Sequence, residues 1–170
     1  MTYQGGALLT NVEAQGVYLG SDWNTNASLK TQAQATDAFL ATLVGGAYMD
    51  MLTNAGYGVG RGSATTGVTD NISINKNVAL SDAQIQADLQ AMIAGGQGAA
   101  PDANRLYMVY VEPGVAVQLG SASSKTSFLG YHGAFGFHTA SGTIDIHYAV
   151  MPYPSSPNPN RLASTCTEPT

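Results

Sequence analysis

Hydrophobic spacing along the first third of the chain predicts two helices. Apolar residues from Leu29 onward, including Leu40, recur mostly at three- and four-residue steps. This spacing predicts a helix with one buried stripe that ends near the Gly-Gly pair at 45–46. Residues 47–56 then predict a second, short helix, which Asn-Ala-Gly terminates.

The stretch "LSDAQIQADLQAMIAGG" at 80–96 predicts a third helix, with defined ends. Ser81 as N-cap and Gln84 three residues later form a capping-box pattern, and Leu80 is placed to pack on Ile85. Further apolar residues follow on one face, and a Gly-Gly pair closes the pattern. We expect a helix whose inner face packs on the core.

Two other stretches have the patterns of strands. Residues 106–111 are all apolar or aromatic and stop at a proline, which predicts a central strand covered on both faces. Residues 143–151 alternate, so that Asp145 and His147 share one face of a second strand. The segment before it carries His138 and predicts the other arm of a hairpin.

The remaining segments are glycine-rich or short. Residues 57–67 contain four glycines, but their spacing lacks the G-x-G-x-x-G fingerprint, so we interpret them as a loop and not as a nucleotide site. Short strands are predicted over 16–23 and 115–119, and a strand or edge ribbon over 68–78.

The order of these elements predicts an α/β fold in which helices flank a mixed β-sheet. A chain of 170 residues is long enough for one core and short for two ordinary domains, so we expect a single domain over 1–151. Five of the seven prolines fall within 152–170, which predicts an extended tail.

Composition narrows the classes of partner. Only 10% of the residues are charged, against about 25% in an average soluble protein. The net charge of −5 and the scattered basic residues argue against nucleic acid as a partner. The sequence contains no apolar run of the roughly 20 residues that span a bilayer. Low charge and a lone Cys166 favour a secreted protein that lacks a partner for this cysteine.

All three histidines, His132, His138 and His147, lie within one short segment, and two interpretations stay open. The three imidazoles could hold a metal such as zinc, with Asp145 or Glu112 completing or orienting the ligand set. Their spacings match no compact ligand motif, however. In the other interpretation, His138 and His147 are cross-strand neighbours on a half-exposed sheet.

Other chemistry has less support in the sequence. No G-x-S-x-G nucleophile elbow is present, and the proline-rich surroundings of Cys166 supply no base to activate its thiol. Trp23, nine tyrosines and many hydroxyl and amide side chains could form a polysaccharide-binding surface. We expect Tyr107 and Tyr110 to belong to the core.

Four stretches in order resemble the EXORDIUM, or phosphate-induced, protein family and its secreted bacterial relatives. The opening "YQGGALLTNVEAQGVYLGSDW" is similar to the first motif of that family, and the predicted helix at 80–96 to its capped helix. "RLYMVYVEPGVAV" resembles its central strand, and "GYHGAFGFHTASGTIDIHYAVMPYP" its G-x-H segment, strand and Pro-rich turn.

The resemblance implies a zincin-like fold and a function. In the longer bacterial relatives a helix that begins His-Glu follows this region and resembles the zinc-binding helix of metallopeptidases. No His-Glu pair is present here, so the resemblance implies the N-terminal portion of a secreted zincin-like domain. It also makes His132, in "GYHG", a candidate pocket residue.

We therefore expect a portion of a metallopeptidase-like hydrolase domain, active with zinc only when another segment or chain completes it. This hypothesis predicts an exposed apolar strip on the sheet, covered by a second polypeptide or by another copy. The alternative is a non-catalytic extracellular or cell-surface module for glycan binding or self-association.

Overall fold

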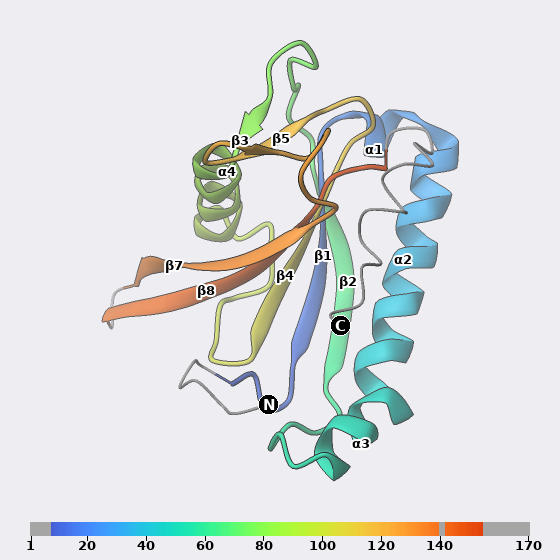
Figure 1. Cartoon of the computed structure of the whole chain (residues 1–170), viewed down its shortest axis with the longest axis vertical. Helices are drawn as coiled ribbons and strands as arrows, with labels where there is room; N and C mark the ends of the chain where they lie inside the picture. The colour runs from blue at the N-terminus through green and yellow to red at the C-terminus, as the bar shows by residue number, and fades with distance from the viewer. Residues whose placement is uncertain (1–7, 140–141, 155–170) are drawn as a thin grey trace, which may run out of the picture.

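The computed structural model describes residues 8–139 and 142–154 as an α/β fold, as the sequence predicts (Figure 1). The larger sheet has the strand order β2-β1-β4-β8-β7. Its strands are β1 (Glu13–Leu19), β2 (Ser63–Asp70), β4 (Arg105–Val111), β7 (Tyr131–Thr139) and β8 (Gly142–Met151). All pair in parallel except β7, which is antiparallel to β8.

Four helices and a small second sheet surround this larger sheet. The helices are α1 (Asp22–Thr25), α2 (Ala27–Gly45), α3 (Ala47–Asn54) and α4 (Asp82–Ala94). The small sheet has the order β3-β5-β6 and contains β3 (Leu80–Ser81), β5 (Val117–Leu119) and β6 (Ala122–Ser123). Figure 1 shows α2 along one side of the larger sheet and α4 on the other.

Helix α4 confirms its sequence pattern. The Gln84 backbone N–H donates to Ser81 Oγ at 3.3 Å, and the Ser81 backbone N–H donates to Gln84 Oε1 at 2.9 Å, so both halves of the capping box form. The buried face of α4 consists of Ile85, Leu89, Met92 and Ile93. It packs on alternate residues of β1, β4 and β8 to form the largest core cluster.

Strand β4 lies at the centre of the sheet, as predicted, but only one of its two faces is fully buried. Tyr107 and Val109 are buried against α4, whereas Leu106, Met108 and Tyr110 on the other face are only half-buried. On this face Leu106 packs against a cluster that contains Val44 of α2 and Met49 of α3, and Tyr110 packs against one that contains Leu29 of α2, so the helices cover it only in part. The prediction of a strand covered on both faces is therefore confirmed on the α4 side and holds only in part on the α2 side.

Strand β2 begins at Ser63, inside the glycine-rich segment predicted to be a loop, and ends at Asp70. The glycines permit this because they let the backbone approach its neighbours. A Cβ on Gly62 would lie 1.9 Å from the Val12 carbonyl oxygen, and one on Gly67 would lie 2.5 Å from the Tyr18 ring. Close packing on β1 therefore decides where the strand begins.

The strand order places a topological switch between β1 and β4. After β1 the chain moves to one side to form β2, and then returns past β1 to form β4 on the other. In open parallel sheets, ligand sites form at such a switch, outside the carboxyl ends of the strands. We call this end of the sheet, where Leu19 and Val111 terminate their strands, the carboxyl edge.

None of the helices in the described part of the chain combines the length and hydrophobicity needed to cross a bilayer.

Candidate functional site

A buried carboxylate lies at the carboxyl edge. Glu112 follows β4 directly and is 1% exposed. Its Oε2 accepts a hydrogen bond from the Asp22 backbone N–H at 2.8 Å, and its Oε1 lies 3.7 Å from Lys76 Nζ. Lys76 also pairs with the Asp22 carboxylate at 2.5 Å. These contacts join the ends of β1 and β4 to the loop that follows β2.

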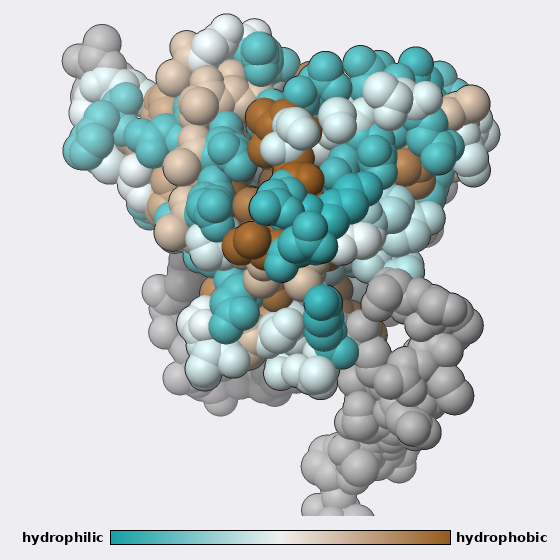
Figure 2. Space-filling model, turned by 90° about the horizontal axis from the view of Figure 1, so that it is seen from above, coloured by the Kyte–Doolittle hydropathy of each residue, from teal (hydrophilic) through white to brown (hydrophobic). Residues whose placement is uncertain are grey.

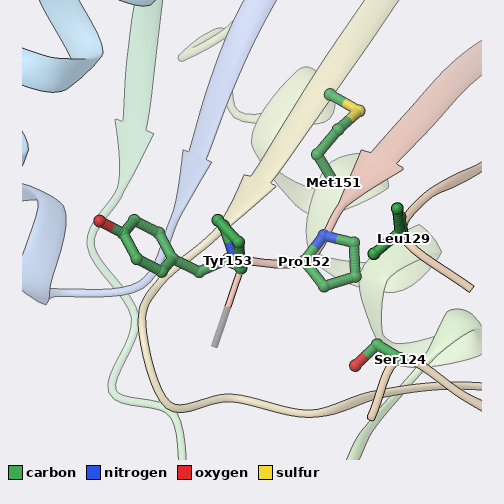
Figure 3. Close-up of a pocket in the computed structure, with 6 residues that line it drawn as sticks. Ser124, Leu129, Met151, Pro152 and Tyr153 are labelled. Carbon is green, nitrogen blue, oxygen red and sulfur yellow. The ribbon is translucent and has the colours of Figure 1, made fainter. Parts of the chain in front are cut away.

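Tyr153 crosses the same edge from β8 toward α2. Its hydroxyl donates to Gln32 Oε1 at 3.1 Å, and its ring meets Trp23 edge-on at 6.1 Å between centroids. Figure 3 shows Pro152 and Tyr153 across the strand ends, with Tyr153 pointing away from Leu129 and Ser124. The chain therefore leaves β8 toward the α2 side of the sheet.

The Pro152–Pro154 segment separates two hollows. One, of about 280 Å³, is drawn in Figure 3 and lies between this segment, Ser124 and Leu129. The other, of about 190 Å³, we call the Trp23 hollow. Its lining includes Trp23, Gln32, Thr36, Tyr110, Pro152 and Tyr153. Figure 2 looks onto this end of the molecule and shows hydrophobic surface near the middle, between hydrophilic margins.

On the α2 side of the sheet, the described residues include a second surface that the helices cover only in part, which we call the open face. It consists of half-buried residues of β4 and β8 and exposed residues of β7: Leu106, Met108, Tyr110, His147, Ala149, Met151, His132 and Ala134. At one end, a shallow hollow of about 380 Å³ is lined by Leu9, Leu106 and two histidines, His132 and His147. The open face is thus largely apolar, with imidazoles at its margin.

The strand register decides which histidines are neighbours. His138 pairs with Thr143, whose Oγ1 lies 3.0 Å from His138 Nδ1, and His147 pairs with Ala134. The interpretation of His138 and His147 as cross-strand partners is therefore wrong. His132 pairs with Ala149, two positions from His147, so these two imidazoles are diagonal neighbours that line one hollow.

The described residues do not assemble a metal site by themselves. Within 8–139 and 142–154, no group of three or more His, Cys, Asp or Glu side chains is arranged to hold an ion. The three candidate ligands His132, His138 and His147 therefore do not converge. Asp145 is exposed and lies opposite Gly136, as the alternation predicts for its face. Cys166 lies outside the described residues.

Trp23 is not the exposed sugar platform that the sequence suggested. It is only 3% exposed and packs against the Tyr18 ring at 5.1 Å between centroids. Tyr18 in turn stacks on Tyr110 at 5.5 Å. Burial and the nearby Asp37 carboxylate raise the pKa of Tyr110 to about 12, so its hydroxyl stays protonated at neutral pH.

A network on the opposite side of the sheet, missed by the sequence analysis, ties α4 to the hairpin. Asp82 Oδ1 accepts from the hydroxyls of Tyr131 and Tyr148 at 2.7 and 2.8 Å, and Gln86 donates to Asp82 Oδ2 at 2.8 Å. Burial, followed by the Asp82 contact, raises the pKa of Tyr131 and raises that of Tyr148 to about 12. The sequence signal was Asp82 in the first helical turn, which has an ordinary use at the helix dipole.

The fold and the site together define an α/β protein with two hollows at the carboxyl edge of its sheet and an open face on the α2 side. Comparisons of the chain with family models, with curated proteins and with solved structures find no match.

Proposed function

We propose that this chain is the N-terminal portion of a secreted, zincin-like hydrolase domain of the metallopeptidase type. A further segment or chain completes it by packing a zinc-binding helix on the open face. The observation that supports this proposal is the one-sided cover of β4 and β8. Parallel sheets in α/β proteins are covered on both faces, whereas here the residues of β4 and β8 on the α2 side are only half-buried within the described part of the chain.

The path of the chain favours the same arrangement. Tyr153 follows β8 and contacts Gln32 of α2, so the chain at this residue lies on the side of the sheet that carries the open face. A helix that packs there would lie beside α2 and bury Met108 and Met151. The hydrophobic effect provides the driving force, at about 25 cal/mol per Å² of apolar surface removed from water.

The described residues fit zinc only in part. His132 and His147 line one hollow, but two imidazoles are fewer than the three protein ligands of a catalytic zinc site. The other ligands would therefore come from the added segment. Zinc bound in such a site would supply a Lewis acid and an activated water. We derive no catalytic step for the present residues.

Native mass spectrometry of the protein, isolated from its source without chelator, tests the proposal. We expect zinc together with polypeptide mass beyond the 17.5 kDa of this chain. Met108→Glu on the open face should abolish that association. Gln90→Glu, on the exposed outer side of α4, is the matched control and should preserve it. A metal-free species with the mass of this chain alone would contradict the proposal.

A second copy of the chain is the other candidate cover for the open face. A metal-free homodimer that Met108→Glu dissociates would favour the alternative function, an extracellular or cell-surface module that binds or assembles without catalysis. The same largely apolar face supports this alternative, since burial by a like surface would also remove it from water.

A further inference from the structure

Trp23 carries an unsatisfied donor. Its indole Nε1 is the one buried side-chain nitrogen or oxygen without a hydrogen-bond partner in the described part of the chain. A buried donor without an acceptor costs about 1–3 kcal/mol, and such groups call for an explanation. Trp23 lines the Trp23 hollow, and a small shift of its buried ring would let an acceptor bound there satisfy its N–H.

Other polar groups of the hollow are available to the same ligand. The Tyr110 hydroxyl forms no hydrogen bond with a described residue. Gln32 uses its Oε1 to accept from Tyr153, which leaves its Nε2 as a donor. Thr36 donates to the Gln32 carbonyl oxygen at 2.9 Å, which leaves its own oxygen as an acceptor. The hollow therefore combines donors with an acceptor, as a polyhydroxylated ligand requires.

The charges in and near the hollow indicate a neutral ligand. None of the described residues that line it carries a charge. Asp37 is close enough to raise the pKa of Tyr110, so its field disfavours an anion there. A cation would meet mainly donor groups. Pro152, Met151 and the ring of Tyr153 add an apolar wall, against which the C–H face of a sugar ring can pack.

We propose that the Trp23 hollow binds one neutral pyranose ring, with a sugar oxygen accepting from Trp23 Nε1 and the Tyr110 hydroxyl. Its volume of about 190 Å³ has room for a single ring. The hollow shares Tyr110 and Met151 with the open face, but sugar binding there needs no zinc and no added segment. A peptide carbonyl, for example in a proline-rich segment that enters an aromatic groove, is the competing occupant.

The test uses the fact that Trp23 is the single tryptophan of the chain, so one indole N–H signal in an NMR spectrum reports on this site alone. The whole chain, without metal, is titrated with methyl β-D-glucopyranoside and with its galacto and manno counterparts. We expect a saturable shift of the indole N–H signal for at least one glycoside. Tyr110→Phe should weaken that binding about tenfold, because a bound acceptor loses a buried donor.

Two further measurements make the result decisive. Tyr57→Phe alters an exposed hydroxyl outside the hollow and should leave the affinity unchanged. Calorimetric titration of Trp23→Phe, which keeps an aromatic ring but removes the N–H, should also show about tenfold weaker binding. If Trp23→Phe fails to fold, Tyr110→Phe still decides the question.

Several outcomes would overturn the inference. One is the absence of any indole shift with all three glycosides. Another is a shift with acetyl-tetraproline amide and none with a glycoside, which would assign the hollow to peptide. Glycoside binding that Tyr110→Phe leaves at full affinity would place the sugar elsewhere. None of these outcomes bears on zinc content, so the proposed function stands or falls separately.

Discussion

At the carboxyl edge, Gly20 lies so close to the Glu112 side chain that no residue with a Cβ atom fits at position 20 without displacing it. A Cβ on Gly20 would lie 2.3 Å from Glu112 Oε2, and Gly20 has a φ of +117°. Glu112 in turn accepts from the Asp22 backbone N–H. The glycine after β1 therefore permits the contact through which β4 holds the next loop.

Gly20→Ala should lower the free energy of unfolding by about 2–4 kcal/mol, from backbone strain and from displacement of a buried carboxylate. Denaturant unfolding measures this loss. Gly142→Ala is the control, because Gly142 has a φ of +135° with nothing within 4 Å of the added Cβ. Equal losses in the two variants would show that the Glu112 contact contributes nothing.

Lys76 should stabilise the fold mainly through Glu112. Its Nζ lies 3.7 Å from the buried Glu112 carboxylate, and removal of a partner from a buried charge is costly. Lys76→Met should lower the free energy of unfolding by about 1–2 kcal/mol. The loss should be clearly smaller when Glu112 is already replaced by Gln. Arg61→Met, which breaks the exposed Arg61–Asp50 pair, should have little effect. Additive losses for Lys76 and Glu112 in the double-mutant cycle would contradict this prediction.

Alkaline pH should weaken the link between α4 and the hairpin. The pKa of Tyr148 is raised from about 10 to about 12 in the folded state, mainly by burial and then by Asp82. Its contribution to stability is therefore fully present below pH 10 and is lost as the pH rises from about 10 to about 12. Unfolding at several alkaline pH values should show this decline. It should be shallower in Tyr148→Phe than in Tyr57→Phe, and parallel profiles would refute the assignment.

The capping box should contribute measurably to stability. Ser81→Ala removes the oxygen that accepts from the Gln84 backbone N–H and should cost about 1 kcal/mol. Ser28→Ala, in the first turn of α2 where Asn26 supplies the cap, should change the midpoint of thermal unfolding far less. If both variants lower the midpoint of thermal unfolding equally, the Ser81–Gln84 capping box contributes no stability of its own.

The sequence determined the elements whose signals are local. Periodicity predicted α2 and α4, the capping residues placed the start of α4, and alternation put Asp145 and His147 on one face of β8. Each of these signals depends on residues within a few positions of one another, so no knowledge of the fold was needed.

Tertiary structure decided the rest, because register and cover depend on segments far apart in the chain. Pairing of β7 with β8 brought His132 beside His147 and matched His138 with Thr143, which spacing alone could not specify. Pairing with β1 makes β2 begin at Ser63, inside the segment predicted to be a loop. The Tyr18 and Tyr153 rings pack against Trp23, and one face of β4 is only half-buried. Composition and periodicity carry no information about which distant segment covers a given residue.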